Sequence, residues 1–357
     1  MKVVLIGVGQ AGGKVTQTIV EFDHEMGFGA VQDAFAVNTA ESDLQSLDID
    51  SMLIGQDRVK GHGVGGDNEL GAEIMQAEAT EVMDQLAGRV TSEVEAVMIV
   101  AGLGGGTGSG GAPALAKELR RIHDIPVYVL GILPGRDEGS IYQANAGRSL
   151  KTVVRESDAA ILIDNDAWRE SGESVEEGFA TINEQISQRV GLLLASGETV
   201  DGVAESVVDS SEIINTLRDG GVASLGYATA EASEDAGENV NVITSLARSA
   251  LLTSMSLPDA VEAEAALLVV AGAPDRISRK GVERARKWVE EETGSLQVRG
   301  GDFPLDTDRL GALVLLGGVE RSRRLEEFMQ RAREAREESQ QRDPTETFQS
   351  EELEDLF

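Results

Sequence analysis

A glycine-rich loop constrains the fold of this 357-residue chain more than any other stretch of its sequence. Seven glycines lie between Gly102 and Gly111, after the apolar run EAVMIV and before the helix-forming stretch PALAKELRRIHD. Glycine weakens strands and helices alike, so such a dense run between two regular elements has to serve the loop itself. Open parallel sheets bind their ligands in loops of this kind, outside the carboxyl ends of the strands. The sequence therefore predicts an α/β fold with a ligand beside this loop.

The same alternation of strand-like and helix-like segments runs through the first half of the chain. Apolar runs predict strands at 2–9, 33–39, 51–55, 95–102, 125–134 and 158–166. Amphipathic spacing predicts helices at 12–24, 69–88 and 139–156. The pattern SVEEGFATINEQISQRVGLLLAS then predicts one long helix, and the segments after it mix helices with strands.

This organisation predicts four parts. An N-terminal Rossmann-like domain with a parallel sheet covers 1–173, and a central helix covers 174–205. A smaller α+β C-terminal domain covers 206–325, and 326–357 form a charged helix and an acidic tail that we expect to be disordered. Two interpretations of the tail stay open: a plain solvated segment, or a short helix that docks on a partner through its few hydrophobic residues.

Composition excludes several classes of protein. The chain carries 63 acidic and 31 basic residues, a formal net charge of −32, and it has no cysteine. Such a charge repels nucleic acids and anionic membranes, and the absence of cysteine excludes disulfides and thiolate metal sites. The apolar runs are shorter than the roughly 20 residues of a membrane span. We expect a cytoplasmic protein that binds no nucleic acid and does not insert into a membrane.

The basic residues are unevenly divided between arginine and lysine. The sequence has 24 arginines and 7 lysines. An acidic, lysine-poor and cysteine-free composition is typical of salt-adapted proteins of halophilic archaea, although an ordinary acidic protein stays an alternative. Molar salt shortens the Debye length to about 3 Å and screens most of this charge.

Three loops are suited to phosphate. GVGQAGGK (7–14), GHGVGGDNELG (61–71) and the loop at 101–111 each place free backbone N–H groups before or at a helix. Thr107 adds a hydroxyl, and Asp67 and Asn68 add the oxygen ligands that Mg²⁺ prefers. The first loop alone also fits a dinucleotide fingerprint, but the second strand ends in Asn38 instead of the expected acid. Three such loops predict a nucleoside triphosphate.

A base site is predicted on the long helix. Phe179 and Asn183 are four residues apart and therefore lie on one helix face. The phenylalanine ring can stack on a purine, and the amide oxygen can accept hydrogen bonds from N1–H and N2–H₂ of guanine.

The motif GLGGGTGSG resembles the signature G-G-G-T-G-[ST]-G of the tubulin/FtsZ superfamily, and the other loops resemble its nucleotide loops in order up to about residue 325. The resemblance implies a GTPase fold that binds GTP and GDP, with Mg²⁺ near Asp67 and with K⁺ or Na⁺ as further candidate ions. Glu138 matches a ribose-contacting glutamate, and Asn165 matches the asparagine of an I-P-N motif. The implied nucleotide-binding residues are Gly9, Gln10, Ala11, Gly12, Lys14, Asn38, Gly66, Asp67, Asn68, Gly104, Gly105, Gly106, Thr107, Gly108, Glu138, Asn165, Phe179 and Asn183.

A further segment, VVDSSEIINTL (207–217), resembles the catalytic synergy loop of the superfamily. Asp209 and Glu212 match its two acids. The resemblance implies a head-to-tail homopolymer in which these two acids hydrolyse GTP held by the neighbouring subunit. Taken without the resemblance, an Asp and a Glu at a helix start are usually capping groups.

Departures from the FtsZ pattern indicate which branch of the superfamily the chain resembles. Val207 replaces an asparagine, Tyr142 replaces an arginine near the γ-phosphate, and the chain end lacks the proline-containing peptide that docks division partners. The chain looks most like the archaeal CetZ family, which is linked to cell shape, and adaptor proteins are candidate partners for its tail. Three alternatives stay open: a GTP-binding structural or regulatory protein with little turnover, an FtsZ-like division protein, and a nicotinamide-dependent oxidoreductase.

Overall fold

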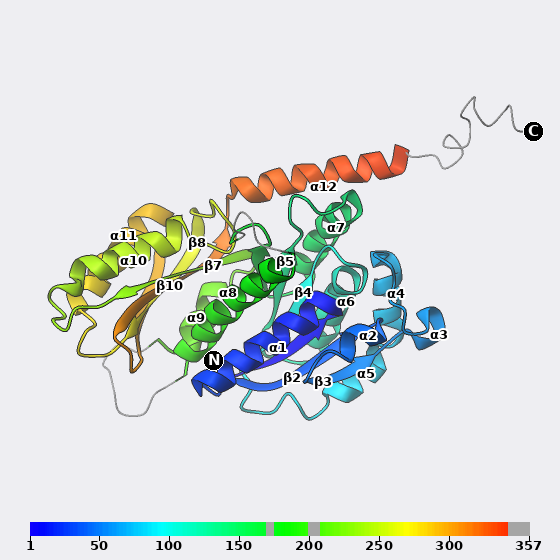
Figure 1. The fold of residues 1–357 in the computed structure, drawn as a ribbon, viewed down its shortest axis with the longest axis horizontal. Helices are drawn as coiled ribbons and strands as arrows, with labels where there is room; N and C mark the ends of the chain where they lie inside the picture. Colours follow the sequence, from blue (N-terminus) through cyan, green and yellow to red (C-terminus); the bar gives the residue numbers. More distant parts are fainter. Residues whose placement is uncertain (169–174, 199–207, 342–357) are drawn as a thin grey trace, which may run out of the picture.

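A computed structural model of the chain describes residues 1–168, 175–198 and 208–341 (Figure 1). The N-terminal elements are β1 (Val3–Val8), α1 (Gly9–Met26), β2 (Val31–Asn38), α2 (Glu41–Leu44), β3 (Asp50–Leu53), α3 (Gln56–Val59), α4 (Asn68–Ala77), α5 (Ala79–Leu86), β4 (Ala96–Gly102), α6 (Gly106–Ile122), β5 (Val127–Leu133), α7 (Ser140–Glu156) and β6 (Ala159–Asp164). The later elements are α8 (Val175–Ser196), α9 (Ser210–Leu217), β7 (Val222–Glu231), α10 (Asn239–Leu252), β8 (Ala263–Gly272), α11 (Arg279–Thr293), β9 (Gln297–Pro304), β10 (Arg309–Val319) and α12 (Arg323–Gln341).

One continuous sheet connects the two halves of the chain. The strand order is β3-β2-β1-β4-β5-β6-β7-β10-β8-β9. All pairings from β3 to β7 are parallel, whereas β10 runs antiparallel to both β7 and β8. The predicted α/β class with a parallel N-terminal sheet is therefore confirmed. The joining of the C-terminal strands to the same sheet through β6 and β7 was not predicted from the sequence.

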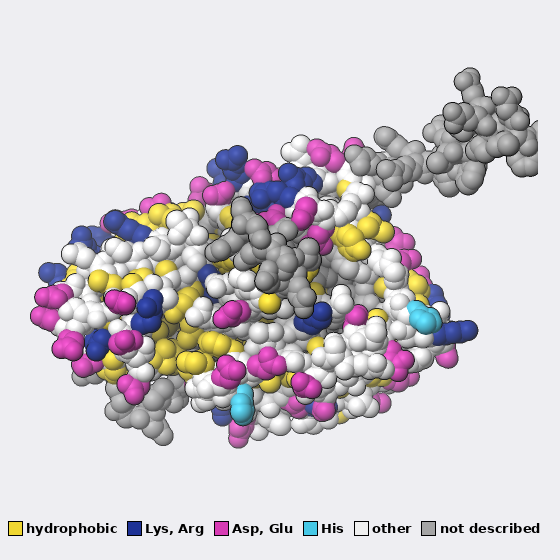
Figure 2. Space-filling view, in the orientation of Figure 1, with side chains coloured by type: hydrophobic (Ala, Val, Ile, Leu, Met, Phe, Trp, Pro, Cys, Tyr) yellow, Lys and Arg dark blue, Asp and Glu magenta, His cyan; other side chains and the backbone are white. Residues whose placement is uncertain are grey.

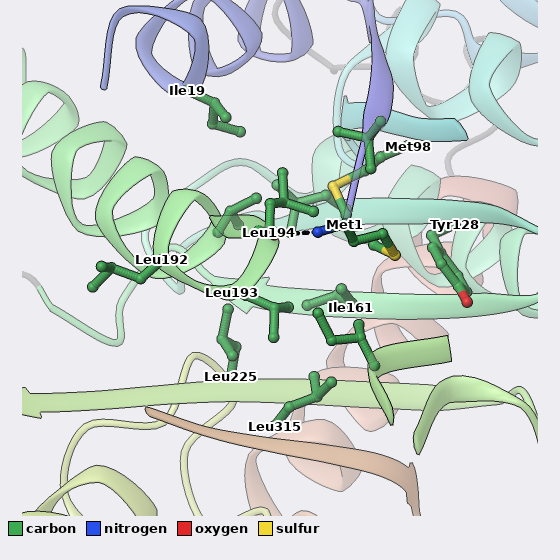
Figure 3. Close-up of a cluster of buried hydrophobic side chains, with 14 of the residues drawn as sticks. Met1, Ile19, Met98, Tyr128, Ile161, Leu192, Leu193, Leu194, Leu225 and Leu315 are labelled. Carbon is green, nitrogen blue, oxygen red and sulfur yellow. Dashed lines mark hydrogen bonds between the residues drawn. The ribbon is translucent and has the colours of Figure 1, made fainter. Parts of the chain in front are cut away.

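The parallel strands are continuous apolar runs because helices cover both of their faces. Every residue of β1 is buried, and so is every residue of β5 and β6. Alternate side chains of β1 enter two separate cores, one below α1 and α8 and the other below α4, α6 and α7. Figure 3 shows the first core, in which Leu193 of α8 lies among side chains of β4, β5, β6, β7 and β10. The central helix therefore packs against strands of both halves.

The predicted helix at 69–88 is two helices. Glu78 leaves the helical conformation, with φ −104° and ψ 17°, and separates α4 from α5. Its Oε1 accepts a hydrogen bond of 2.7 Å from the backbone N–H of Gly55. This long-range contact fixes the break, and a local helical pattern carries no information about it.

The C-terminal helix α12 lies along α7 at the top of the molecule in Figure 1. A Cβ on Gly147 of α7 would lie 2.5 Å from Cβ of Ala332, so only glycine allows this close approach. In the part of the chain that the structure describes, no helix is both long and apolar enough to cross a bilayer. Asp and Glu side chains are spread over the whole face seen in Figure 2. The predicted tail from 342 onward, Val207 and the predicted start of the central helix at Ser174 lie outside the described residues.

Candidate functional site

A cavity of about 660 Å³ opens at the carboxyl ends of β1, β2, β4, β5 and β6. Its size suits a nucleotide-sized ligand, and its position is where open parallel sheets bind ligands. The predicted binding residues that line it are Gly9, Gln10, Ala11, Lys14, Asn38, Gly66, Gly104, Gly105, Gly106, Thr107, Gly108, Glu138, Asn165, Phe179 and Asn183. Three predicted binding residues do not line it: Gly12, Asp67 and Asn68.

Glycine is needed in the loop at 101–111 for two different reasons. A Cβ on Gly108 would lie 2.6 Å from the carbonyl oxygen of Gly102, so the loop could not close with a side chain there. Gly105 has an ordinary φ of −71°, and a Cβ on it would meet no atom of the described chain within 4 Å. Gly105 lines the cavity, so its missing side chain leaves room for a ligand that approaches the backbone.

Two helices point their N-termini at this space. Within the described chain, neither α1 nor α6 receives a hydrogen bond from a capping side chain at its start. The first N–H groups of a helix need partners, and together with the helix dipole they attract anions. The residues that start these two helices, Gly9 and Gly106, both line the cavity. This end of the cavity therefore suits phosphate groups.

Thr107 lies in the first turn of α6, where its side chain is almost fully buried. Its Oγ1 is 2.7 Å from Oγ1 of Thr39, which follows β2 and is fully buried. Sequence analysis identified Thr107 but not Thr39. The pairing depends on two loops that are far apart in sequence and adjacent in the sheet.

Asp67 has a structural role that sequence analysis did not predict. Its Oδ1 accepts hydrogen bonds of 3.0 Å from the backbone N–H groups of Glu69 and Leu70, and so caps α4. A metal at Asp67 would therefore use the other carboxylate oxygen. In the described part of the chain, no group of three His, Asp or Glu side chains gathers as a metal site. The assignment of Asp67 to Mg²⁺ stays a prediction.

Glu138 and Asn165 lie together in the cavity, on the loops after β5 and β6. Glu138 Oε1 accepts hydrogen bonds from the backbone N–H of Gly135, at 2.7 Å, and from Nδ2 of Asn165, at 3.3 Å. The cavity is also lined by Phe179 of α8, and this residue is 49% exposed. An exposed aromatic ring at a cavity is a stacking surface. These residues can hold a sugar and a base while the glycine loops hold phosphates.

Asp43 is a lining residue that sequence analysis missed. Its carboxylate accepts hydrogen bonds from Nε2 of Gln10, at 3.1 Å, and from Nδ2 of Asn38, at 3.0 Å. It thereby holds two of the predicted binding residues in place. No spacing rule indicates this role, since the three residues meet only in the folded sheet. Tyr142, noted as a departure, also lines the cavity and is 41% exposed.

The two predicted catalytic acids lie outside the cavity. Asp209 precedes α9 and Glu212 is in its first turn, and α9 packs on β8, β9 and β10. Glu212 is half-buried, and burial followed by the charge of Asp209 raises its pKa, while Arg299 of β9 opposes this effect. A single chain therefore does not bring these acids to its own cavity.

Comparison with known proteins gives two family matches that together span most of the chain. Residues 2–173 match the family model of the tubulin/FtsZ GTPase domain, and residues 172–334 match that of the tubulin-like CetZ C-terminal domain. Among curated proteins, the tubulin-like protein CetZ2 of Haloferax volcanii is 65% identical over the full length of both chains. CetZ1 of the same organism is 50% identical over 94% of this chain and 93% of its own.

Solved structures agree with these relatives. The GTPγS-bound protofilament of Haloferax volcanii CetZ2 has a TM-score of 0.92 at 65% identity, covering 95% of this chain and all of that one. The GDP-bound CetZ1 monomer has a TM-score of 0.87 at 52% identity, with 94% and 100% coverage. An FtsZ dimer of M. jannaschii has a TM-score of 0.72 over 89% of this chain and 88% of its own, and at 23% identity it indicates the fold alone.

Proposed function

Because the chain belongs to the CetZ family of tubulin-like cytoskeletal GTPases, we propose that it binds GTP and GDP in the described cavity and assembles head to tail with copies of itself. GTP hydrolysis then takes place at the junction of two subunits, where Asp209 and Glu212 of one subunit meet the nucleotide of the next. The two solved Haloferax volcanii relatives are a GTPγS-bound protofilament and a GDP-bound monomer, which supports both parts of the proposal.

One observation carries the assembly requirement. In the described part of the chain, two carboxylates line the cavity, those of Asp43 and Glu138. Both already accept hydrogen bonds from neighbouring groups of the same chain. Each thereby fixes a loop of the cavity, whereas Glu212, whose pKa is raised, lies half-buried away from the cavity. Two separate halves of an active site on one chain require a second chain to join them.

In this proposal, different residues of the cavity bind different parts of the nucleotide. Backbone N–H groups of α1, α6 and the loop at 101–111 bind the phosphates, and Lys14 adds positive charge. Glu138 and Asn165 hold the ribose, and Phe179 and Asn183 hold the guanine. Asp209 and Glu212 of the neighbouring subunit orient the attacking water and accept its proton.

A magnesium ion fits the phosphate end of the cavity. Bound to a nucleotide, Mg²⁺ takes most of its ligands from phosphates and water and needs few protein oxygens. Oγ1 of Thr107, which is 2.7 Å from Oγ1 of Thr39, would supply such an oxygen, and Asp67 lies in the adjacent loop. The ion would neutralise phosphate charge, and K⁺ or Na⁺ from a salt-rich cytoplasm would contribute to the same end.

We further propose that the filament controls cell shape, because the CetZ family is linked to that role. The acidic segment from 342 onward is the proposed docking site for adaptor proteins. The alternative role is in division, and imaging of cells depleted of the protein separates the two. Rounded or misshapen cells that still divide support the first role, and filamentous cells with normal width support the second.

A second candidate function is GTP binding with little turnover. It is favoured by Tyr142 at the cavity, in the place of an arginine that would stabilise the γ-phosphate. The rate of phosphate release, measured on protein that retains bound nucleotide, distinguishes this candidate from the assembly-dependent GTPase. Slow release by fully assembled filaments supports the second candidate.

The central test is GTP turnover per molecule, measured against protein concentration in molar KCl. We expect turnover to rise steeply above a critical concentration, together with light scattering from filaments. Turnover that stays flat contradicts the assembly requirement. Mixing two inactive variants sharpens the test: Glu212→Gln keeps an intact cavity, and Gly105→Val obstructs the cavity but keeps the acids. Restored hydrolysis in the mixture shows that the acids act on a neighbouring subunit, and two additive baselines contradict this.

A further inference from the structure

Arg324, in the first turn of α12, is a buried cation that the proposed function does not use. Its side chain is 3% exposed and faces Asp164 at the end of β6, which is 1% exposed. Nε and Nη2 of the arginine donate to the two carboxylate oxygens of Asp164, the second at 2.9 Å. Nη2 also donates to Oδ2 of Asp166, at 3.1 Å. A buried pair of this kind adds little net stability over apolar residues, which points to a further role.

The two carboxylates lie on either side of a cavity residue. Asn165, between Asp164 and Asp166, lines the cavity at the Glu138 end. Asp166 Oδ2 also accepts a hydrogen bond of 2.8 Å from the backbone N–H of Arg136, in the loop after β5. One guanidinium thus holds the loop after β6 directly and the loop after β5 through Asp166.

These two loops carry the predicted ribose contacts. Glu138 closes the loop after β5 by accepting from the Gly135 N–H at 2.7 Å, and it also accepts from Nδ2 of Asn165 at 3.3 Å. Arg324 does not itself line the cavity. Its influence on a ligand would therefore pass through Asp164 and Asp166 to Asn165 and Glu138.

We propose that Arg324 is a positioning residue that sets the sugar specificity of the nucleotide cavity. It holds Glu138 and Asn165 in the geometry that accepts ribose hydroxyl groups, and it connects α12 to the nucleotide. The inference rests on the proposed GTP site. A site built to bond a hydroxyl rejects a ligand that lacks it, because its own polar groups are left unpaired. Loosening those groups removes the discrimination.

The geometry requires arginine at this position. A planar guanidinium can bridge two carboxylates with hydrogen bonds in fixed directions, whereas a lysine ammonium is a point charge on a flexible chain. Arg324→Lys therefore keeps the charge and loses the bridge. Asp166→Asn keeps the pair with Asp164 but weakens the connection to Arg136. Arg331, on the same helix, is exposed and has no ion pair in the described part of the chain, so Arg331→Lys is the matched control.

The test measures dissociation constants for GTP, 2′-deoxy-GTP and 3′-deoxy-GTP on full-length protein, together with melting temperatures. We expect the unaltered protein and Arg331→Lys to prefer GTP over at least one deoxy analogue by about tenfold or more. In Arg324→Lys and Asp166→Asn this preference falls to about twofold, because GTP binding weakens while deoxy analogue binding changes little. Glu138→Gln is the positive control, since it alters the ribose contact itself.

Three results overturn the inference: an unaltered protein that binds GTP without discrimination, variants that retain full discrimination while Glu138→Gln loses it, or equal weakening of all three nucleotides. A merely structural role predicts the last of these, because partial unfolding affects every ligand alike. If Arg324→Lys does not fold, Asp166→Asn decides alone. Failure of the unaltered protein to bind any guanine nucleotide contradicts the proposed function instead, so the two failures are distinguishable.

Discussion

The carboxylate of Asp209 caps the helix that carries Glu212. Its Oδ1 accepts a hydrogen bond of 3.2 Å from the backbone N–H of Glu212. Sequence reasoning without the family resemblance favours a capping role, and Asp209 has that role. The proposed catalytic role, inferred from the resemblance, belongs to Asp209 and Glu212 together. Because a cap depends on an acceptor atom and water activation depends on a negative charge, substitutions can separate the two roles.

Asp209→Asn is expected to keep the helix and lose hydrolysis. Asparagine caps helices as well as aspartate does, so the melting temperature should stay close to that of the unaltered protein. Asp209→Ala removes the cap too and should cost about 0.5–2 kcal/mol of stability. Calorimetry and phosphate release on the same samples check this. Equal hydrolysis by Asp209→Asn and unaltered filaments would contradict a catalytic role.

Glu212→Gln is expected to lower turnover by about 10²–10⁴-fold, the usual contribution of a general base. It should also raise stability at neutral pH. A folded-state pKa above the ordinary 4.5 stabilises the folded chain at low pH, and this contribution is lost as the pH rises through the raised value. Burial, followed by the charge of Asp209, causes the shift. Glutamine lacks this dependence, so the stability gain should vanish below about pH 4.5.

Turnover by unaltered filaments should also begin to fall at a higher pH than an ordinary glutamate would cause, as acidification protonates Glu212. Chemical denaturation and turnover between pH 4 and 8 test both statements. Glu81→Gln, an exposed substitution on α5, is the control and should leave both curves unchanged. A Glu212→Gln protein that is less stable at pH 7 would show that the carboxylate has a structural role.

Two glycine-to-alanine substitutions distinguish a glycine that packing requires from a glycine that leaves room for the ligand. Gly12→Ala places a Cβ 2.2 Å from the carbonyl oxygen of Val100 and should cost about 1–3 kcal/mol. Gly105→Ala meets no described atom within 4 Å and has an ordinary φ, so stability should change by less than about 0.5 kcal/mol. Nucleotide affinity should nevertheless fall about tenfold in Gly105→Ala. Unchanged affinity in that variant would indicate that the ligand does not approach this backbone.

Thr39→Val is expected to weaken Mg²⁺-dependent nucleotide binding without contacting the nucleotide. The Oγ1 atoms of Thr39 and Thr107 are 2.7 Å apart, and valine has no hydroxyl with which to orient that of Thr107. Loss of one buried hydrogen-bond partner costs about 1–3 kcal/mol. Thr39→Ser keeps the hydroxyl and should bind almost normally. Titration of nucleotide binding with Mg²⁺ checks this, and identical curves for the valine and serine variants would contradict it.

Much of the site could be predicted from the sequence because its chemistry lies in short loops. The loop at 101–111 is identifiable from local residue type and spacing, and the pair Phe179 and Asn183 becomes a candidate once the glycine-rich loops indicate a nucleotide. The strand-like runs were also local, since strands covered on both faces are continuously apolar. These features need no knowledge of which segments meet in space.

The remaining contacts join residues that are distant in sequence. Asp43 holds Gln10 to Asn38, Thr39 pairs with Thr107, and Arg324 reaches back to Asp164 across 160 positions. Glu78 ends a helix because it bonds to Gly55. Sequence by itself determined the class of fold, the glycine-rich loops that line the cavity and the family. Tertiary structure alone decided which polar groups pair, because hydrogen bonds depend on distances that sheet order and helix packing set.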